Sequence, residues 1–169
     1  MRSDSSNSSG MVYVHSSLAA LCPHVEWALA RVLGEPVHLE WDAQPAGEHL
    51  RRTEFCWHGP LGTGARLASA LHGWDELRFE ITEDPSALTD GERWMHTPEL
   101  GIFHAQTDTA GSVVVPEDRV KQALESAGAS PFEIRREFRL VLGTAWDEEL
   151  EPYRRAGDSS PVVWLHRVG

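Results

Sequence analysis

The chain has few of the features that mark a secreted or membrane-spanning protein. Its 169 residues contain only two cysteines, Cys22 and Cys56, which we expect to be free thiols in a reducing compartment. No window approaches the roughly 18 apolar residues of a membrane span, and the N-terminus has no apolar stretch of the kind found in secretory signals. We therefore expect a cytoplasmic protein without a structural disulfide.

Positive charge is also scarce. The chain has 15 Lys plus Arg against 26 Asp plus Glu, which gives a formal net charge of -11. No basic cluster is longer than an arginine pair. A protein with this field repels polyanions unless its few cations gather in one patch. We therefore expect no nucleic acid and no anionic membrane among the partners.

The chain does have enough apolar residues for a conventional core. Hydrophobic residues make up 41% of it, and they include seven tryptophans. A chain of this length forms one domain and buries roughly two-thirds of its unfolded surface. The Ser-rich residues 1–10 have nothing to bury and predict a disordered tail. We expect one domain over 11–169, with a core unit at 11–83 and an extension at 84–169.

The spacing of apolar residues predicts an α+β fold. Strand patterns and helical patterns alternate along the core unit, with strands over 11–16, 37–41, 53–58 and 77–83 and helices after the first and third of them. This order is the split βαβ arrangement of the ferredoxin-like fold, an antiparallel sheet with helices on one face. The extension predicts a β-hairpin around Pro98–Gly101, a short strand at 112–115, two helices and a C-terminal strand. The second helix would begin at Ser130 and run through Leu150.

The same alternation predicts one polar face on the sheet. If the two early helices cover one face, the polar alternates lie on the other. These residues are Tyr13, His15, His38, Glu40, Glu54, Cys56, His58, Arg78 and Glu80. Two interpretations are open. We favour a solvated face partly covered by the C-terminal elements over a binding surface.

The segment HGPLGTGARLASALHGW, residues 58–74, is the most suggestive motif. Its glycines match the spacing of a P-loop, but Ala65 and Arg66 stand where that loop needs a lysine and a hydroxyl, so nucleotide hydrolysis is not expected. A Rossmann fingerprint is excluded as well, because GxGxxG and a parallel βαβ unit are lacking. The commoner interpretation is a structural turn. The other is a small-anion site at a helix start capped by Thr63, with ligand-binding residues Gly62, Thr63, Gly64 and Arg66.

Two Cys-x-His pairs raise the question of a metal. Cys22 and His24 at a helix start, with Cys56 and His58 on a strand, would together form a Cys2His2 zinc set. The early helices are expected on the face opposite Cys56 and His58, so the two pairs should not meet. Surface histidines and inert cysteines are the favoured interpretation.

Candidates for catalysis are weak. Cys22 at a helix start would have a lowered pKa, and His15 or His24 would be its base, but no local nucleophile motif supports this arrangement. The acidic run from Asp147 to Glu151 is expected to be a solvated helix face. We predict no catalytic residue and no cofactor, which favours a protein that is not an enzyme.

Five segments carry a resemblance to a known family. They are LCPHVEWAL, GPLGTGARLASAL, EITEDPS, LGTAWDEELEPYRRAG and VVWLHRVG, and they resemble an uncharacterised actinobacterial family, domain of unknown function 3145 (DUF3145). The resemblance covers everything after the Ser-rich tail. It implies a cytoplasmic protein that stands alone as one domain, and it points to lipid metabolism as the setting of a partner enzyme. It carries over no catalytic residue.

We therefore predict a non-catalytic protein that binds a small anion or metabolite, or that regulates another protein. The ligand would be a phosphorylated metabolite or an acyl-CoA held by residues 62–66. The alternative is a protein–protein interaction module that docks on a partner enzyme or on itself as a homo-oligomer.

Overall fold

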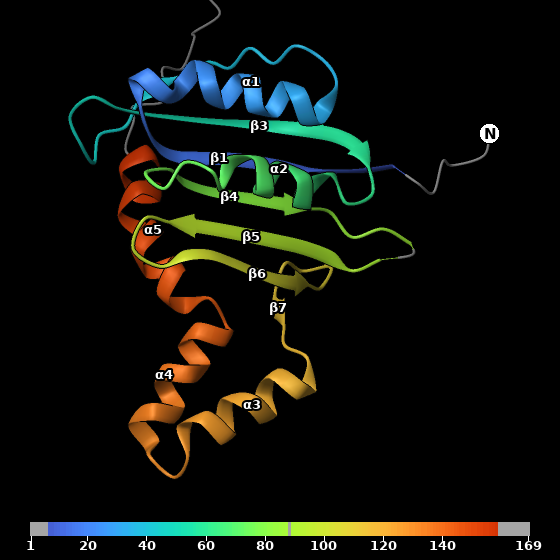
Figure 1. Ribbon diagram of the computed structural model, residues 1–169, viewed down its shortest axis with the longest axis vertical. Helices are drawn as coiled ribbons and strands as arrows, with labels where there is room; N and C mark the ends of the chain where they lie inside the picture. Colours follow the sequence, from blue (N-terminus) through green and yellow to red (C-terminus); the bar gives the residue numbers. More distant parts are fainter. Residues whose placement is uncertain (1–6, 88, 159–169) are drawn as a thin grey trace, which may run out of the picture.

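The computed structural model describes residues 7–87 and 89–158 of the chain (Figure 1). The strands are β1 (Asn7–Leu18), β2 (Asp42–Ala43), β3 (Leu50–Pro60), β4 (Arg78–Glu83), β5 (Gly91–Thr97), β6 (Gly101–Thr107) and β7 (Val113–Val114). The helices are α1 (Cys22–Leu33), α2 (Thr63–Leu71), α3 (Glu117–Ala127), α4 (Pro131–Val141) and α5 (Thr144–Asp158), with a 3-10 turn at Ala19–Leu21. The predicted α+β class is confirmed.

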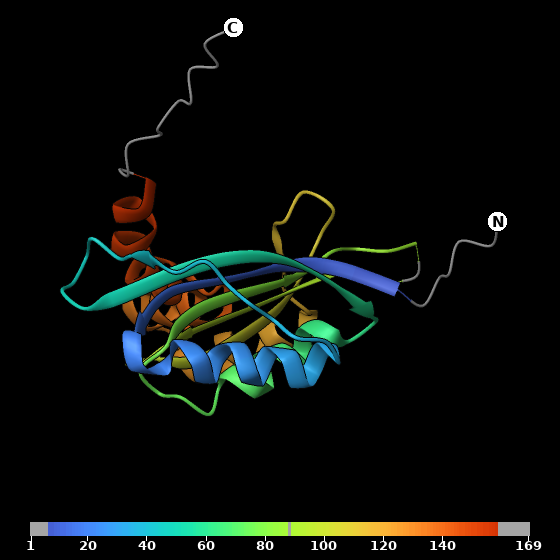
Figure 2. The same ribbon diagram turned by 90° about the horizontal axis from the view of Figure 1, so that it is seen from above.

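The strands form one antiparallel sheet in the order β2-β3-β1-β4-β5-β6-β7. Helices α1 and α2 cover one face of this sheet, and α5 runs across the other face near one end of the strands (Figures 1 and 2). None of the helices in the described ranges has the length and apolar character needed to cross a membrane.

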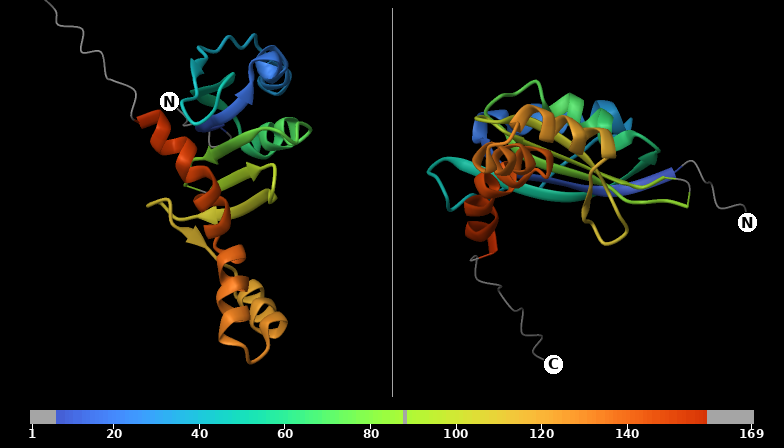
Figure 3. Two further views of the ribbon diagram at one scale, coloured as in Figure 1. Left: turned by 90° about the vertical axis from the view of Figure 1, so that its left-hand side faces the viewer. Right: turned by 90° about the horizontal axis from the view of Figure 1, so that it is seen from below.

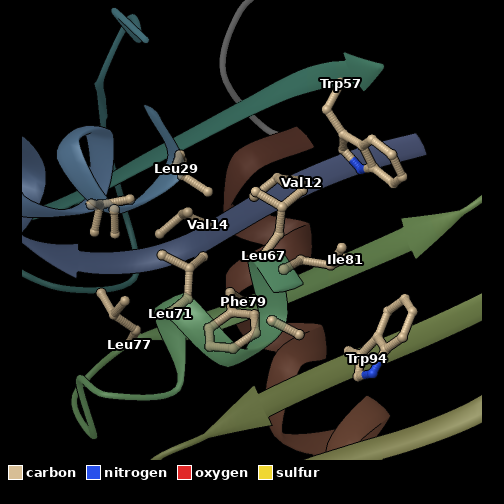
Figure 4. Packing of buried hydrophobic residues seen from close by; sticks show 13 residues of the cluster. Val12, Val14, Leu29, Trp57, Leu67, Leu71, Leu77, Phe79, Ile81 and Trp94 are labelled. Atoms are coloured by element: carbon tan, nitrogen blue, oxygen red, sulfur yellow. The ribbon is translucent and has the colours of Figure 1, made fainter. Parts of the chain in front are cut away.

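The larger core lies between the sheet and the pair α1 and α2 (Figure 4). Alternate residues of the strands form one side of this core, and residues of the two helices form the other. Its fully buried members include Val12, Trp57, Phe79, Ile81, Leu29, Leu67 and Leu71. Burial of each such side chain stabilises the fold by about 1.5–3 kcal/mol. A smaller core under α5 consists of Met95, Phe103, Trp146 and Leu150. The sheet is therefore covered on both faces, but unequally.

The predicted strand over 37–41 is wrong. The backbone N–H of Leu39 and the indole N–H of Trp41 donate to the Glu26 carboxylate on α1, at 3.1 and 2.9 Å. This segment therefore docks on α1, and only the two residues of β2 pair with β3. His38 and Glu40 consequently do not lie on the polar face of the sheet. The ferredoxin-like arrangement is not confirmed, and the sheet continues past β4 through β5 to β7.

Two predicted boundaries also differ from the structure. Residues 7–10, expected in the disordered tail, begin β1 and pair with residues 57–60 of β3. The single helix expected from Ser130 through Leu150 is two helices, because Gly143 with φ of +75° turns the chain between α4 and α5. The hairpin is confirmed as β5 and β6, and the expected C-terminal strand at 161–169 lies outside the described residues.

Helices α3 and α4 form an arm, residues 117–141, that projects beyond the end of the sheet formed by β6 and β7 (Figures 1 and 3). The predicted cap at Ser130 begins α4, where its hydroxyl accepts the Glu133 N–H at 3.4 Å. No residue of α4 is buried, and α3 buries only Ala123 and Ala127. The arm has no core of its own.

Candidate functional site

The glycine-rich loop leads into α2, and its amides are hydrogen bonded within the chain. Gly62, with φ of +83°, is the N-cap of α2. Its N–H donates to Glu83 Oε1 at 2.8 Å, and the N–H of Gly64 donates to Glu83 Oε2 at 2.9 Å. Glu83 ends β4 and is buried. A carboxylate of the chain itself therefore takes the position that the predicted anion would take, where the positive end of the helix stabilises it.

The other two predicted ligand-binding residues contact each other. The Thr63 hydroxyl donates to the Pro60 carbonyl at 2.7 Å and accepts from Arg66 Nη2 at 2.7 Å. Gly62, not Thr63, is the cap, because the positive φ suits glycine. The four predicted residues thus lie together, but an external anion would have to displace Glu83. Anion binding at this loop stays a prediction.

The structure does not bring the two Cys-x-His pairs together. Cys22 and His24 begin α1 on one face of the sheet. Cys56 and His58 alternate with buried Trp57 on β3 and so point away from α1. Across the described ranges, no group of three or more His, Cys, Asp or Glu side chains could hold a metal ion.

The thiol of Cys22 is not activated. Its Sγ lies 3.6 Å from the Leu18 carbonyl oxygen, and burial raises its pKa. The lowered pKa considered from the helix start is therefore wrong, since desolvation disfavours the thiolate.

The polar face of the sheet carries a charged network beneath α5. Its centre is Glu80 on β4, whose side chain is 10% exposed. The Glu80 carboxylate contacts His15 Nε2 at 2.6 Å, Arg93 Nη2 at 2.7 Å and Arg154 at 2.9 Å through Nε and 2.7 Å through Nη2. Three strands and α5 thus meet at one carboxylate.

Asp147 of α5 closes this network. Its Oδ1 accepts from Arg93 Nη2 at 2.9 Å and from Arg154 Nη2 at 3.0 Å. Asp147 lies in the acidic run expected on a solvated helix face; its side chain is 38% exposed and also pairs with two arginines. Burial alone would raise the pKa of Glu80, but the hydrogen bond and charge of His15, the charge of Arg154 and the hydrogen bond from Arg93 outweigh it and lower the pKa to about 2.

A groove of about 230 Å³ opens beside the network, between the sheet and the C-terminal half of α5. The residues that matter for its chemistry are Tyr13, His15, Arg52, Glu54, Tyr153 and Asp158. Its walls are fixed by contacts around it. The Arg78 guanidinium stacks 4.5 Å from the centre of the Tyr153 ring, and Gln44 Nε2 donates to the carbonyls of His15 and Tyr153 at 2.6 and 3.3 Å.

Arg52 is the groove cation that is half-buried and has no charged partner among the described residues. Within the described part of the chain it makes no ion pair and no hydrogen bond, whereas Arg154 is bound to Glu80 and Asp147. A Cβ added at Gly157 of α5 would stand 1.6 Å from Arg52 Nη1. Glycine at position 157 therefore leaves the space in which this guanidinium lies.

Sequence reasoning missed the central residues of this site. Arg52 is not among the predicted site residues, although continuing the β3 alternation backwards places it on the face of Glu54 and Cys56. Asp147 and Arg154 are seven residues apart, which is two helical turns and therefore one side of α5. These two spacings are the signals that could have found them.

Residues 11–167 match a protein family described as "Protein of unknown function (DUF3145)". The chain belongs to this family. The match confirms the resemblance seen in the sequence and covers every described element apart from the first residues of β1. Neither the curated proteins nor the solved structures gave a match. The function of the groove therefore has to be argued from its geometry.

Proposed function

We propose that this DUF3145 protein is a non-catalytic binding protein that holds a small anion in the groove under α5, with Arg52 as the anchoring cation. The observation that supports this function is a half-buried guanidinium that has no carboxylate partner among the described residues. Partial burial of an unpaired charge is unfavourable. A guanidinium in such a position binds carboxylate or phosphate through two parallel hydrogen bonds.

The ion pairs around the groove leave Arg52 as the cation that binds the ligand. Glu80 and Asp147 neutralise Arg93 and Arg154, so these two arginines hold α5 on the sheet rather than compete for the ligand. A volume of about 230 Å³ lies below the roughly 300–1,000 Å³ of pockets for drug-sized ligands. The groove therefore suits a small metabolite and is too small for a whole acyl-CoA.

Calorimetric titration at low ionic strength with acetate, inorganic phosphate and a phosphate monoester tests this function. Arg52→Met keeps most of the apolar stem and removes the charge, so affinity should fall by about 10- to 100-fold, the equivalent of about 1.5–3 kcal/mol for a charge-assisted hydrogen bond. Arg51→Met is the matched control, because Arg51 is also half-buried but leaves β3 on the opposite face.

Two results would contradict the proposal. Wild-type protein that binds none of these anions would remove the function altogether. An equal loss of affinity in Arg51→Met and Arg52→Met would show that general charge, and not the groove, attracts the anion.

The arm favours a second function, docking of a protein partner. Phe132 on α4 is 73% exposed, and Leu124 on α3 and Leu140 on α4 are exposed as well. Apolar side chains that are exposed together mark interaction sites more often than apolar side chains scattered singly over the surface do. Sedimentation equilibrium should show association weakened by Phe132→Ser but not by Trp27→Ser, which changes a 59% exposed residue on α1. A monomer at all concentrations would exclude self-association through the arm.

A further inference from the structure

A second charged side chain of the groove has no partner among the described residues. Glu54 lies on β3 two residues after Arg52, opposite Tyr13 in the pairing of β1 and β3. In the described part of the chain it makes no ion pair and no hydrogen bond. Among the described residues that line the groove, Arg52 is a cation without an ion pair and Glu54 and Asp158 are carboxylates without one, and Arg52 does not pair with Glu54.

Arg52 and Glu54 are two residues apart on β3. Residues i and i+2 of a strand point to the same face and stand roughly 6.5–7 Å apart. Long side chains can bridge this separation, but Arg52 and Glu54 make no ion pair with each other in the described structure. A small molecule that carries a carboxylate and an ammonium group on one carbon atom would offer one partner to each of the two side chains.

The electrostatics differ along the groove. At the Tyr13 end, burial raises the pKa of the tyrosine, and the charges of Glu54 and Glu80 raise it further. Asp158 adds another acidic group to the lining. A simple anion would lie next to these carboxylates without a counter-charge of its own, whereas an ammonium group would be attracted by them.

We infer that the ligand is a small zwitterion of the α-amino acid class, with its carboxylate on Arg52 and its α-ammonium group on Glu54. This inference rests on the proposed function, because it needs Arg52 as the anchor. It adds the second anchor and so names the class of ligand. The volume of about 230 Å³ leaves room for a side chain against Tyr13 and Tyr153.

The test compares each ligand with analogues that lack one charge. Calorimetry first identifies the tightest binder among the standard L-amino acids. That amino acid is then compared with its des-amino carboxylic acid and with its decarboxylated amine. We expect the amino acid to bind at least ten-fold more tightly than the carboxylic acid, and the amine not to bind.

Variants assign the two anchors. Glu54→Gln should lower the affinity for the amino acid to that of the carboxylic acid and leave the affinity for the carboxylic acid unchanged. Arg52→Met should weaken both. Glu99→Gln, which changes an exposed glutamate in the turn between β5 and β6, is the matched control and should change neither.

The outcomes separate the two proposals. If the amino acid and its des-amino acid bind equally to the wild type, or if Glu54→Gln keeps the preference, the zwitterion is excluded and the anion function stands. If no amino acid or carboxylic acid binds, the zwitterion is excluded, and if the phosphates do not bind either, both proposals fail. A preference lost only in Glu54→Gln supports the inference.

Discussion

Two regions of the molecule collect donors for an anion, the start of α2 and the groove under α5. At the start of α2, the N–H groups of Gly62 and Gly64 donate to the buried carboxylate of Glu83 from β4. In the groove, Arg52 has no such partner within the described residues. A glycine-lined helix start thus indicates where an anionic group belongs, but whether that group comes from the chain or from a ligand depends on a residue far away in the sequence.

The largest expected effect comes from the carboxylate that holds the groove together. Glu80→Gln removes the charge that pairs with Arg93 and Arg154, and we expect the free energy of unfolding to fall by about 3 kcal/mol, the lower end of the range for breaking a buried pair. Urea denaturation measures it. Asp147→Asn, at a side chain that is 38% exposed, should cost much less. Equal effects of the two variants would show that Glu80 is not the centre of the network.

The same carboxylate should make stability depend on pH. Because the pKa of Glu80 is lowered from 4.5 to about 2 in the folded state, its contribution is complete above pH 4.5 and is lost as the pH falls toward 2. The shift corresponds to about 3 kcal/mol. Denaturation curves between pH 6 and 2 should show a steeper loss in the wild type than in Glu80→Gln. Parallel losses would contradict the network geometry.

A smaller effect on stability is expected at the start of α2. There, a substitution of Glu83 would leave the anion position empty. Glu83→Ala leaves the amides of Gly62 and Gly64 without their acceptor and should destabilise the fold by about 2 kcal/mol. A cavity of about 390 Å³ adjoins Glu83 and gives small ions access. Acetate should therefore restore part of the stability of Glu83→Ala in thermal unfolding, and chloride at equal ionic strength should restore less. No difference between the salts would show that this helix start does not select carboxylates.

Local pattern predicted much of the fold, because hydrophobic alternation and capping act between near neighbours. The strand over 53–58, the hairpin and the cap at Ser130 follow from such patterns. The segment 37–41 has the same alternation, but its apolar side chains pack against the larger core, and Glu26 of α1 accepts hydrogen bonds from Leu39 and Trp41. In this segment, tertiary contacts therefore determined the conformation in place of the local strand propensity.

The candidate site was harder to predict than the fold. The polar face was visible in the alternation, yet Arg52 and Arg154 come from segments 102 residues apart, and α5 was expected to be part of a longer helix. Whether Glu83 fills the helix start, and whether Arg52 stays unpaired, depends on which side chains the topology brings together. Single-sequence patterns carry no information on such long-range pairs.

The smallest expected effect on stability belongs to the residue with the largest expected effect on binding. Arg52→Met removes a charge that no described residue compensates, and the methionine keeps an apolar stem against Gly157. We expect the free energy of unfolding to change by less than about 0.5 kcal/mol in either direction. Urea denaturation without ligand measures this, with Arg66→Met as the comparison, because Arg66 donates to Thr63 beside the filled helix start. An arginine that serves to bind a ligand contributes little to the stability of the fold when the ligand is absent. If Arg52→Met lowers the free energy of unfolding by more than about 1.5 kcal/mol, Arg52 is therefore a structural residue.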